Sequence, residues 1–406
     1  MIFFALSCLV TPTALATPTC PEGTVLGGAI PPDGKEEWCE RNDLKEGPAE
    51  RYHKNGKTKA RGHYADNAET GVWKEYHKNG AQKAEGSYAK GVRQGEWTYW
   101  YKTGQQEGIG GYLSDHKHGA WAYWHENGQK WFDGQYNFGK ADGLWSYWHN
   151  NGEQDSSGRF INGAKYGAWT QFHDNGIKKS EGNFVTGVRD GPWTYWRDDG
   201  TLEKAGSYRA GREFGRWDWS DPAGTPQRIA HYDESGLSGV EQTFNEAGQP
   251  ETETTYVANN KQGPETIFYP SGEKRSVSQY LRHKLNGEAT HFYEDGATER
   301  IEQWTHGVKH GTWTAYWPNG EQKSTGDFEF GEYNGVWVNW YESGQKKAEG
   351  KFVAGKSEGV WVTWYDSGSR KKEGAYKGGK RDGQWTYWNP DGAVDRAETW
   401  AGGVQQ

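Results

Sequence analysis

The feature that most constrains the fold is a glycine that recurs every 24 residues. Counting in steps of 24 from Gly47 meets glycine at fifteen successive positions, the last of which is Gly383. A second glycine column lies nine residues further on, from Gly56 to Gly392, and it is also complete. Such self-similarity without insertions is the signature of a repeat array, in which each unit packs mainly against its neighbours. We therefore expect residues 47–406 to form fifteen tandem units of one structural type.

Each unit has the pattern of a β-hairpin when the first glycine is numbered position 1. Position 3 is Trp in eleven units, position 6 is aromatic in all but one, and position 18 is aromatic in all fifteen. Positions 9 and 10 often read Asn-Gly, which between two aromatic runs predicts a two-residue type I′ turn. No segment has a helical period. The expected fold is all-β, an elongated single-layer antiparallel sheet of about fifteen tandem 24-residue β-hairpin repeats.

A two-residue loop at positions 9 and 10 places position 3 opposite position 16, and position 1 opposite position 18. Position 16 is Gly in ten units, so each Trp is expected to lie over a glycine. Large residues beside glycine fill the sheet without collision. Nine of the eleven units with the Trp keep this Gly, and three of the four units without the Trp lose it. If positions 20 to 23 form the second loop, the same pairs recur between neighbouring units.

The tryptophans at position 3 are expected to form a structural aromatic ladder. Flat rings also stack on sugars and anchor interfaces, so the same residues are the candidate ligand platform. The structural interpretation is favoured because aromatic side chains form the core more often than they contact ligands. The ladder consists of Trp73, Trp97, Trp121, Trp145, Trp169, Trp193, Trp217, Trp313, Trp337, Trp361 and Trp385.

The composition fits a sheet without a second layer. Hydrophobic residues make up 33% of the chain and aromatic residues alone 15%, which leaves too few aliphatic side chains for a layered core. The formal charge of −8 arises from well-mixed acidic and basic residues. Binding driven by phosphate charge is therefore not expected, which excludes nucleic acid and disfavours anionic lipid as partners.

The N-terminal residues indicate export. An apolar run from Ile2 to Val10 precedes a small-x-small cleavage signal at residues 14–16, so residues 1–16 are predicted to be a signal peptide. The run is too short to span a bilayer, and no transmembrane segment is expected in the mature chain. We expect the protein to be periplasmic, on the cell surface or secreted.

Two cysteines remain after cleavage, Cys20 and Cys39. In an oxidising compartment they are expected to form a disulfide that closes an N-terminal cap over residues 17–46. The repeats then fall into three blocks. Residues 47–238 hold eight regular repeats, residues 239–310 three divergent ones without the Trp and its glycine, and residues 311–406 four regular ones. The divergent block is either a flatter, weaker stretch or a bend or binding segment.

Histidine recurs at position 7 in five units, but equivalent positions lie two strands, about 9.6 Å, apart. Zn–N bonds are only about 2 Å long, so shared metal coordination is not expected, and solvated side chains beside the turn are the better interpretation. No Ser-His-Asp set or phosphate-binding loop is recognisable. We expect no enzymatic activity, no cofactor and no metal. The five histidines are His53, His77, His125, His149 and His173.

The sequence WKEYHKNGAQKAEGSYAKG, from Trp73 to Gly91, resembles the MORN repeat in its bacterial variant form. The resemblance covers residues 47–406, although classical MORN units are slightly shorter and read Tyr-x-Gly. It implies a twisted single-sheet trough that serves as a scaffold or contacts protein and lipid, often as a homodimer. Some bacterial relatives are labelled antitoxins, and the family has no catalytic residues to transfer.

The expected function is a non-enzymatic interaction scaffold that binds a protein partner through a long aromatic-lined sheet face. One alternative is a cell-wall or polysaccharide binder, because Trp-rich repeats with glycine turns are also found in glucan-binding proteins. Another alternative is an antitoxin-like role, as in some relatives of the repeat family.

Overall fold

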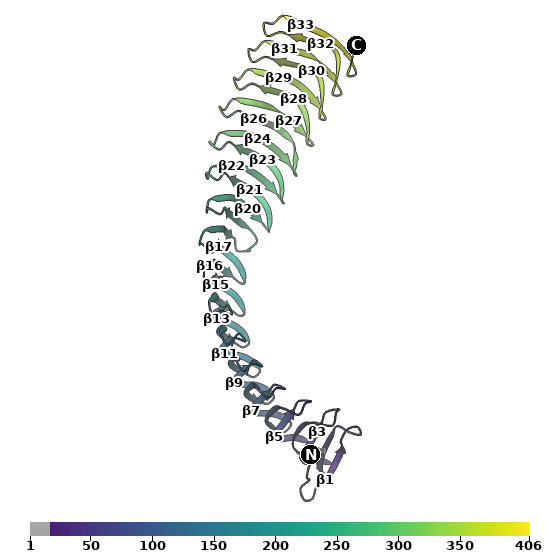
Figure 1. Ribbon diagram of the computed structural model, residues 1–406, viewed down its shortest axis with the longest axis vertical. Helices are drawn as coiled ribbons and strands as arrows, with labels where there is room; N and C mark the ends of the chain where they lie inside the picture. The colour runs from purple at the N-terminus through teal and green to yellow at the C-terminus, as the bar shows by residue number, and fades with distance from the viewer. Residues whose placement is uncertain (1–16) are drawn as a thin grey trace, which may run out of the picture. The chain divides into compact units, whose positions relative to one another are not determined.

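The computed structural model describes residues 17–406, and all its regular elements are β-strands (Figure 1). The predicted signal peptide, residues 1–16, lies outside the described residues. Within residues 17–406 no helix is long and apolar enough to cross a membrane. The expectation of an all-β chain built from antiparallel hairpins is confirmed. The described residues divide into two compact units, one up to Gly200 and the other from Thr201 to Gln406.

In the first unit each strand pairs antiparallel with the next strand along the chain, beginning with a cap hairpin. Its strands are β1 (Val25–Ala29), β2 (Glu36–Arg41), β3 (Leu44–Tyr52), β4 (Thr58–Ala65), β5 (Ala68–Tyr76), β6 (Gln82–Ala89), β7 (Val92–Trp100), β8 (Gln106–Leu113), β9 (His116–Trp124), β10 (Lys130–Asn137), β11 (Lys140–Trp148), β12 (Gln154–Ile161), β13 (Ala164–Phe172), β14 (Lys178–Val185) and β15 (Val188–Trp196).

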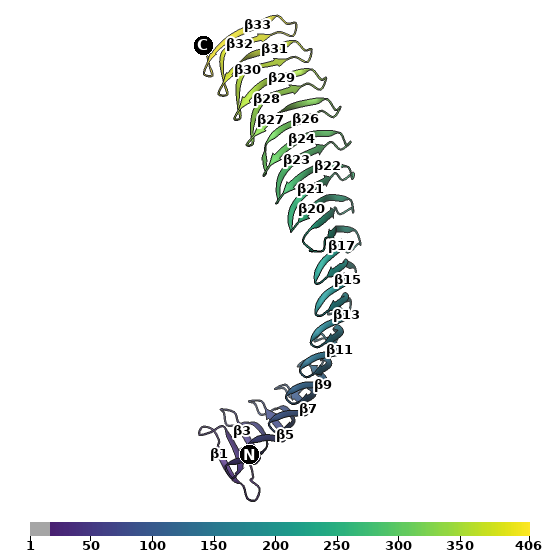
Figure 2. The same ribbon diagram turned by 180° about the vertical axis from the view of Figure 1, so that it is seen from behind.

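The second unit repeats the same order of antiparallel neighbours, as both views of the ribbon show (Figures 1 and 2). Its strands are β16 (Leu202–Arg209), β17 (Arg212–Ser220), β18 (Pro226–Tyr232), β19 (Gly239–Phe244), β20 (Pro250–Val257), β21 (Asn260–Phe268), β22 (Lys274–Leu281), β23 (Lys284–Phe292), β24 (Thr298–Thr305), β25 (Val308–Lys309), β26 (Gly311–Tyr316), β27 (Gln322–Glu329), β28 (Glu332–Trp340), β29 (Lys346–Val353), β30 (Lys356–Trp364), β31 (Arg370–Lys377), β32 (Lys380–Trp388), β33 (Val394–Ala401) and β34 (Val404–Gln405).

The Asn-Gly loop is not the type I′ turn that the sequence predicts. In the second repeat the amide of His77 donates to the carbonyl of Ala81 at 2.8 Å, which encloses a three-residue loop. Gly80 has a φ of 96°, whereas Asn79 is not among the residues with positive φ. This is the geometry of a type I turn followed by a left-handed glycine.

A bulge compensates for the additional loop residue. The ladder between β5 and β6 shifts register between Glu75 and Tyr76, and beyond the shift Trp73 lies opposite Gly86. The two one-residue offsets cancel. The predicted pairing of position 3 with position 16 is therefore confirmed although the predicted turn is wrong.

The type I′ turn is found instead in the connection between one hairpin and the next. Lys90 and Gly91, at positions 20 and 21, have φ values of 51° and 80°. The ladder between β6 and β7 then skips two residues before Trp97, so Tyr88 lies opposite Arg93 and not opposite the glycine of the next repeat. The predicted recurrence of the 16–3 pair between units is correct, and the predicted recurrence of the 18–1 pair is wrong.

The two residues that the ladder skips before each Trp include the glycine at position 1. Gly95 has a φ of 71°, and an added Cβ would meet nothing within 4 Å. Glycine is therefore selected here by the left-handed backbone, which L side chains adopt only at a cost. Packing against the position-18 ring, which the sequence pattern suggests, is not the reason.

One junction in the described ladders lacks this bulge. Between β18 and β19 the register runs without a shift, and Tyr232 lies opposite Gly239. A six-residue loop, residues 233–238, replaces the two-residue turn and is closed by the amide of Asp233 on the carbonyl of Ser238 at 2.8 Å. This irregular loop directly precedes the divergent repeats, residues 239–310.

Candidate functional site

The tryptophans at position 3 form the core of each sheet. Trp313 and Trp361 are half-buried and the other nine are buried. The buried residues are Trp73, Trp97, Trp121, Trp145, Trp169, Trp193, Trp217, Trp337 and Trp385.

Ten of the eleven indoles cover the position-16 glycine of the preceding repeat, and the exception is Trp313, which follows Glu302. A Cβ on Gly86 would lie 2.1 Å from Cδ2 of Trp97, and a Cβ on Gly110 would lie 2.1 Å from Cδ2 of Trp121. Trp97 is a ladder partner of both glycines, but its ring leans back over Gly86. The Nε1 of Trp97 donates to the carbonyl of Ser87 at 3.2 Å, also in the preceding repeat. The tryptophan therefore joins two successive repeats.

Rings and cations enclose each indole on this side of the sheet, which we call the indole face. Trp97 packs edge-on against Tyr88 and Tyr112, with ring centroids 5.1 Å and 6.1 Å away. The guanidinium of Arg93, at position 23, lies 4.2 Å from the centroid of Tyr112. Cation–π contact of this kind stabilises partly desolvated rings. This cation was not predicted from the sequence, although basic residues recur at position 23.

Burial changes the acidity of the groups on the indole face. Lys117 lies 4.3 Å from the centroid of Trp121, and burial lowers the pKa of its ammonium group. Burial also raises the pKa of Tyr147 to about 12. Both shifts have the sign expected when a charged form loses its water.

Alternation along the strand places positions 2, 4, 6, 15 and 17 on the opposite side, which we call the outer face. Apart from the buried Tyr52, the position-6 rings are half-buried, and they form the aromatic row of the outer face. The predicted ligand platform at position 3 is thus occupied by packing, and a ligand that stacks on rings would meet position 6. The tryptophans of this row are Trp100, Trp124, Trp148, Trp196, Trp340, Trp364 and Trp388.

Charged side chains flank the position-6 rings. Lys130 lies 4.9 Å from the centroid of Trp148 and forms an ion pair with Asp133 at 2.8 Å. The same arrangement recurs around Trp196 and Trp364. Each ring therefore presents an apolar surface beside one cation and one carboxylate.

Small and aliphatic residues form the middle of the outer face. A shallow depression of about 520 Å³ is lined by Ile109, Ala120, Ala122 and Leu144, with glycines between them. Leu144, at position 2, is 76% exposed. Val72, Val336 and Val360 occupy position 2 in other repeats and are also exposed.

The position-7 histidines bind the next repeat. In each of them Nε2 lies within hydrogen-bond distance of the position-6 carbonyl one repeat on, for example 2.8 Å from His77 to the carbonyl of Trp100. Tyr101 and four later tyrosines make the same contact through their hydroxyl groups. The interpretation of these histidines as solvated side chains is wrong, because they are half-buried structural contacts. The described residues contain no group of three or more His, Cys, Asp or Glu side chains that could hold a metal ion. All five predicted histidines make this contact, namely His53, His77, His125, His149 and His173.

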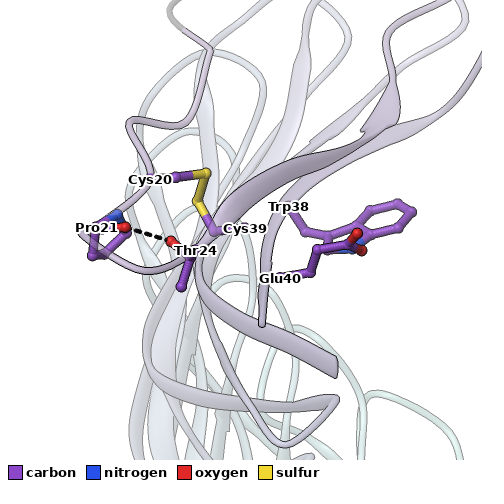
Figure 3. The surroundings of a disulfide bond; sticks show 6 residues. All are labelled: Cys20, Pro21, Thr24, Trp38, Cys39 and Glu40. Carbon is purple, nitrogen blue, oxygen red and sulfur yellow. Dashed lines mark hydrogen bonds between the residues drawn. A yellow bond between two sulfur atoms is a disulfide. The ribbon is translucent and has the colours of Figure 1, made fainter. Parts of the chain in front are cut away.

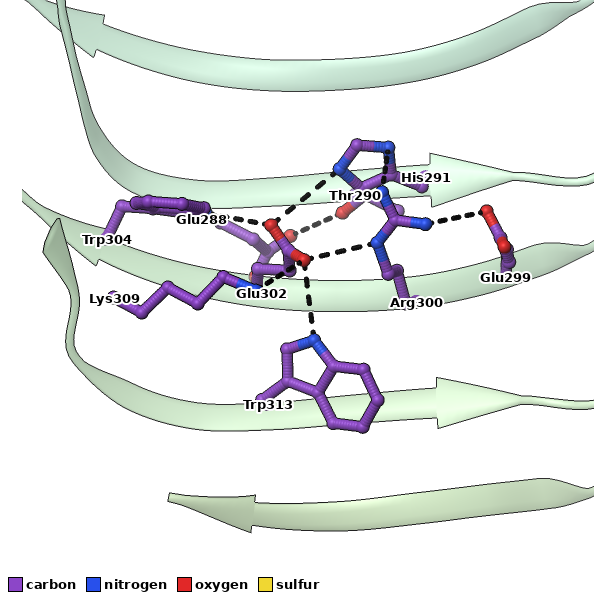
Figure 4. Close-up of polar contacts among 9 residues, drawn as sticks. All are labelled: Glu288, Thr290, His291, Glu299, Arg300, Glu302, Trp304, Lys309 and Trp313. Carbon is purple, nitrogen blue, oxygen red and sulfur yellow. Dashed lines mark hydrogen bonds and ion pairs between the residues drawn. The ribbon is translucent and has the colours of Figure 1, made fainter. Parts of the chain in front are cut away.

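The divergent repeats end in a buried polar cluster around Glu302 (Figure 4). This carboxylate stands at position 16, where regular repeats have glycine, and its side chain is 8% exposed. It accepts hydrogen bonds from Arg300 at 3.1 Å and from the indole of Trp304 at 3.0 Å. The ammonium of Lys309 lies 3.3 Å away, and the indole of Trp313 donates to it at 3.4 Å. Charge pairing here replaces the contact between glycine and indole.

The predicted disulfide is present in the cap. Cys20 and Cys39 are bonded with a Cα–Cα distance of 5.4 Å (Figure 3). Cys39 lies on β2 and is fully buried. The disulfide attaches the segment before β1 to the first hairpin.

A single-layer sheet of stacked hairpins, with its ring core on one face, defines the class of the protein as an all-β repeat protein. The family described as MORN repeat variant matches residues 45–66, 165–185 and 333–354. The three segments begin at the same position of their repeats, since their first residues differ by whole multiples of 24. The chain is a MORN repeat protein of this variant type.

No curated protein matches the chain. Among solved structures, TcdB2-TccC3 is similar at 12% identity with a TM-score of 0.15, over 94% of this chain and 22% of that chain. TcdB2-TccC3-Cdc42 is similar at 11% identity with a TM-score of 0.15, over the same shares. The chain thus spans about a fifth of the length of these structures. A TM-score this low supports no inference about this protein.

Proposed function

We propose that the protein is an exported, non-enzymatic scaffold that binds a protein partner on its outer face. The observation that carries this proposal is the division of the aromatic residues between the two faces. Nine of the eleven position-3 indoles are buried as core, whereas the position-6 tryptophans on the outer face are half-buried and the aliphatic residues at position 2 are exposed.

The chemistry of the outer face fits a protein partner. Half-exposed Trp side chains supply large contact areas, and such anchors carry most of the energy of protein interfaces. Glycine and alanine around Ile109 and Leu144 allow a partner to approach the backbone closely. The flanking ion pairs, such as Lys130 with Asp133, provide a polar rim.

Export is supported by the cap. A disulfide such as that between Cys20 and Cys39 persists in oxidising compartments and is rare in the cytosol. Together with the apolar leader sequence, it favours the periplasm, the cell surface or the medium.

The test compares capture of envelope proteins by the mature chain and by outer-face variants. Leu144→Glu places a charge on a residue that is 76% exposed, and Trp148→Ala removes one accessible ring. Both variants are expected to lose the captured partner while their melting temperatures change little. Phe138→Glu, on a residue of the turn between β10 and β11 that is 58% exposed, is the matched control and should retain the partner. Equal capture by Leu144→Glu and the parent chain would refute the outer face as the binding surface.

Binding of a cell-wall polysaccharide is the second candidate, because the position-6 rings stand beside carboxylates that can accept bonds from sugar hydroxyls. A glycan array and sedimentation with peptidoglycan separate the two functions. Sugar binding that is lost in Trp124→Ala with Trp148→Ala would favour the polysaccharide over the protein partner.

A further inference from the structure

A cavity of about 640 Å³ lies between the cap loop and the first two Asn-Gly loops of the array. Four lysines line it, namely Lys35 from the loop between β1 and β2, Lys54 and Lys59 from the first repeat, and Lys78 from the second. No carboxylate is among the lining residues. The whole chain has a formal charge of −8, so this cavity is a local concentration of positive charge.

None of these lysines forms an ion pair in the part of the chain that the structure describes, in contrast to Lys74 and Lys83 nearby, which pair with Glu85 and Glu75. Asp33 belongs to the same cap loop but is not among the residues that line the cavity. Like charges gathered around one cavity raise the local positive potential and attract anions.

The position of two of the lysines in the repeat supports this interpretation. Position 8 is the exposed tip of the Asn-Gly loop, and it is Lys in the first three repeats and never Lys afterwards. From the fourth repeat on it is Glu, Asp, Asn or Pro, beginning with Glu126. Because the loop geometry is the same throughout, the turn itself does not require lysine. The position-8 lysines are confined to the three repeats nearest the cap.

We propose that this cavity binds a compact, soluble polyanion that carries two or more phosphate or carboxylate groups. Its volume lies in the range of small-ligand sites. Lysine supplies mobile point charges that suit clustered anionic oxygens of variable geometry. The lining contains Pro31 and Pro32 but no large aliphatic side chain that would enter a bilayer, which favours a dissolved ligand over a membrane surface. This site lies apart from the outer face and does not depend on the proposed scaffold function.

The experiment uses the mature chain with its disulfide intact and titrates it with inorganic tripolyphosphate by calorimetry at low and moderate salt. The double variant Lys54→Glu with Lys78→Glu is expected to weaken binding by about tenfold or more, because it reverses two of the four charges. Lys102→Glu is the matched control, since Lys102 occupies position 8 of the third repeat outside the cavity. It should change the affinity by less than about twofold, because a charge outside the cavity is largely screened by salt.

All three substituted lysines are exposed, so unchanged thermal melting of the variants verifies that the fold is intact. Three outcomes would overturn the proposal. They are no detectable binding of tripolyphosphate, an equal loss in Lys102→Glu and the double variant, or binding only to phosphatidylglycerol vesicles that tripolyphosphate does not displace. The second outcome would show unspecific attraction along the loops, and the third would show a membrane surface.

Discussion

The regular repeats before residue 239 and the divergent repeats over residues 239–310 use the same hairpin ladder with different contacts between repeats. In the regular block a glycine and an indole meet, as Gly86 and Trp97 do. In the divergent block the same register pairs Thr254 with Glu265 and Ser278 with Ala289. The backbone therefore does not need the indole to keep its period. The indole adds a tight apolar contact, and this contact leaves no space for a side chain at position 16.

The divergent contacts depend on charge where the regular contacts depend on shape. Thr254 donates to the carboxylate of Glu265 at 3.3 Å, and Lys261 pairs with that same carboxylate. Buried polar pairs of this kind require that every partner stay satisfied, because removing one leaves an unpaired buried group. The two blocks are thus expected to respond differently to substitution and to pH.

The largest expected effect comes from adding a side chain under an indole. Gly110→Val places atoms where Trp121 already lies, and the ring is too closely packed to shift, so we expect destabilisation by about 3 kcal/mol or more. Ser278→Val, at the same position of a divergent repeat, should cost much less because its ladder partner Ala289 has no ring to collide with. Urea unfolding followed by Trp fluorescence measures both changes. Equal losses would show that the indole contact is not what distinguishes the blocks.

A transplant of the regular pair into the divergent block sharpens the comparison. Ser278→Gly together with Ala289→Trp is expected to stabilise the array by about 1–2 kcal/mol, since it buries an indole over a free glycine. Ala289→Trp alone should destabilise, because Ser278 occupies the space that the ring needs. The coupling energy from a double-mutant cycle checks this directly. Additive effects would contradict the assigned geometry.

A smaller difference is expected at the Asn-Gly loops. The side chain of Asn79 donates to the carbonyl of Lys102 at 3.0 Å and accepts from the amide of Ala81 at 3.1 Å. Asn79→Ala should therefore cost about 1 kcal/mol. Asp295→Ala, in a divergent repeat, removes only the bond from the Ala297 amide and should cost less. Thermal or urea midpoints decide the order, and a larger loss at Asp295 would reverse it.

The smallest expected effect is a pH dependence at the buried Glu302 cluster of the divergent block. Burial by itself raises the pKa of Glu302, but Lys309 and Arg300 outweigh it and hold the pKa below its ordinary value. Burial, together with Arg300, also lowers the pKa of His291. Both groups bind protons more weakly in the folded chain than in the unfolded chain. Their contribution to stability is therefore complete above the ordinary values, about 6.5 for His and 4.3 for Glu, and is lost as the pH falls below them.

Hydrogen exchange measured residue by residue tests this dependence. Amides around Glu302 should lose protection as the pH falls from neutral to about 4, after correction for intrinsic exchange, while those around Trp169 should not. In Glu302→Gln the part of the change below the ordinary Glu value should disappear. A uniform loss of protection over both blocks would show that the cluster is not responsible.

The glycine period and the pairing of positions 3 and 16 could be predicted from the sequence because each leaves a fixed spacing, and the cap disulfide because only two cysteines follow the predicted signal peptide. The turn type could not be predicted, because two different structural requirements can select an Asn-Gly pair. A type I′ turn needs left-handed backbone at both residues, whereas here Asn79 is selected by its side-chain bonds to the next repeat. A pattern within one repeat does not distinguish these causes.

The lean of each indole over the glycine of the preceding repeat did leave a signal in the sequence. All ten glycines at position 16 are followed eleven residues later by Trp, as Gly62 is by Trp73. Comparison within single units instead produces exceptions, such as Trp217 with Ala230. The burial of position 3 and the exposure of position 6 had no such signal, since both columns are aromatic. That difference depends on which rings the neighbouring repeats enclose.

The backward lean of the indole determines where such an array can be divided without damage. A break at a type I′ turn, between Gly86 and Trp97, would separate a ring from the glycine that it covers. A break at an Asn-Gly loop leaves each of these pairs within one fragment. The natural splice points for lengthening or shortening the protein are therefore the Asn-Gly loops, and the modular block runs from one such loop to the next.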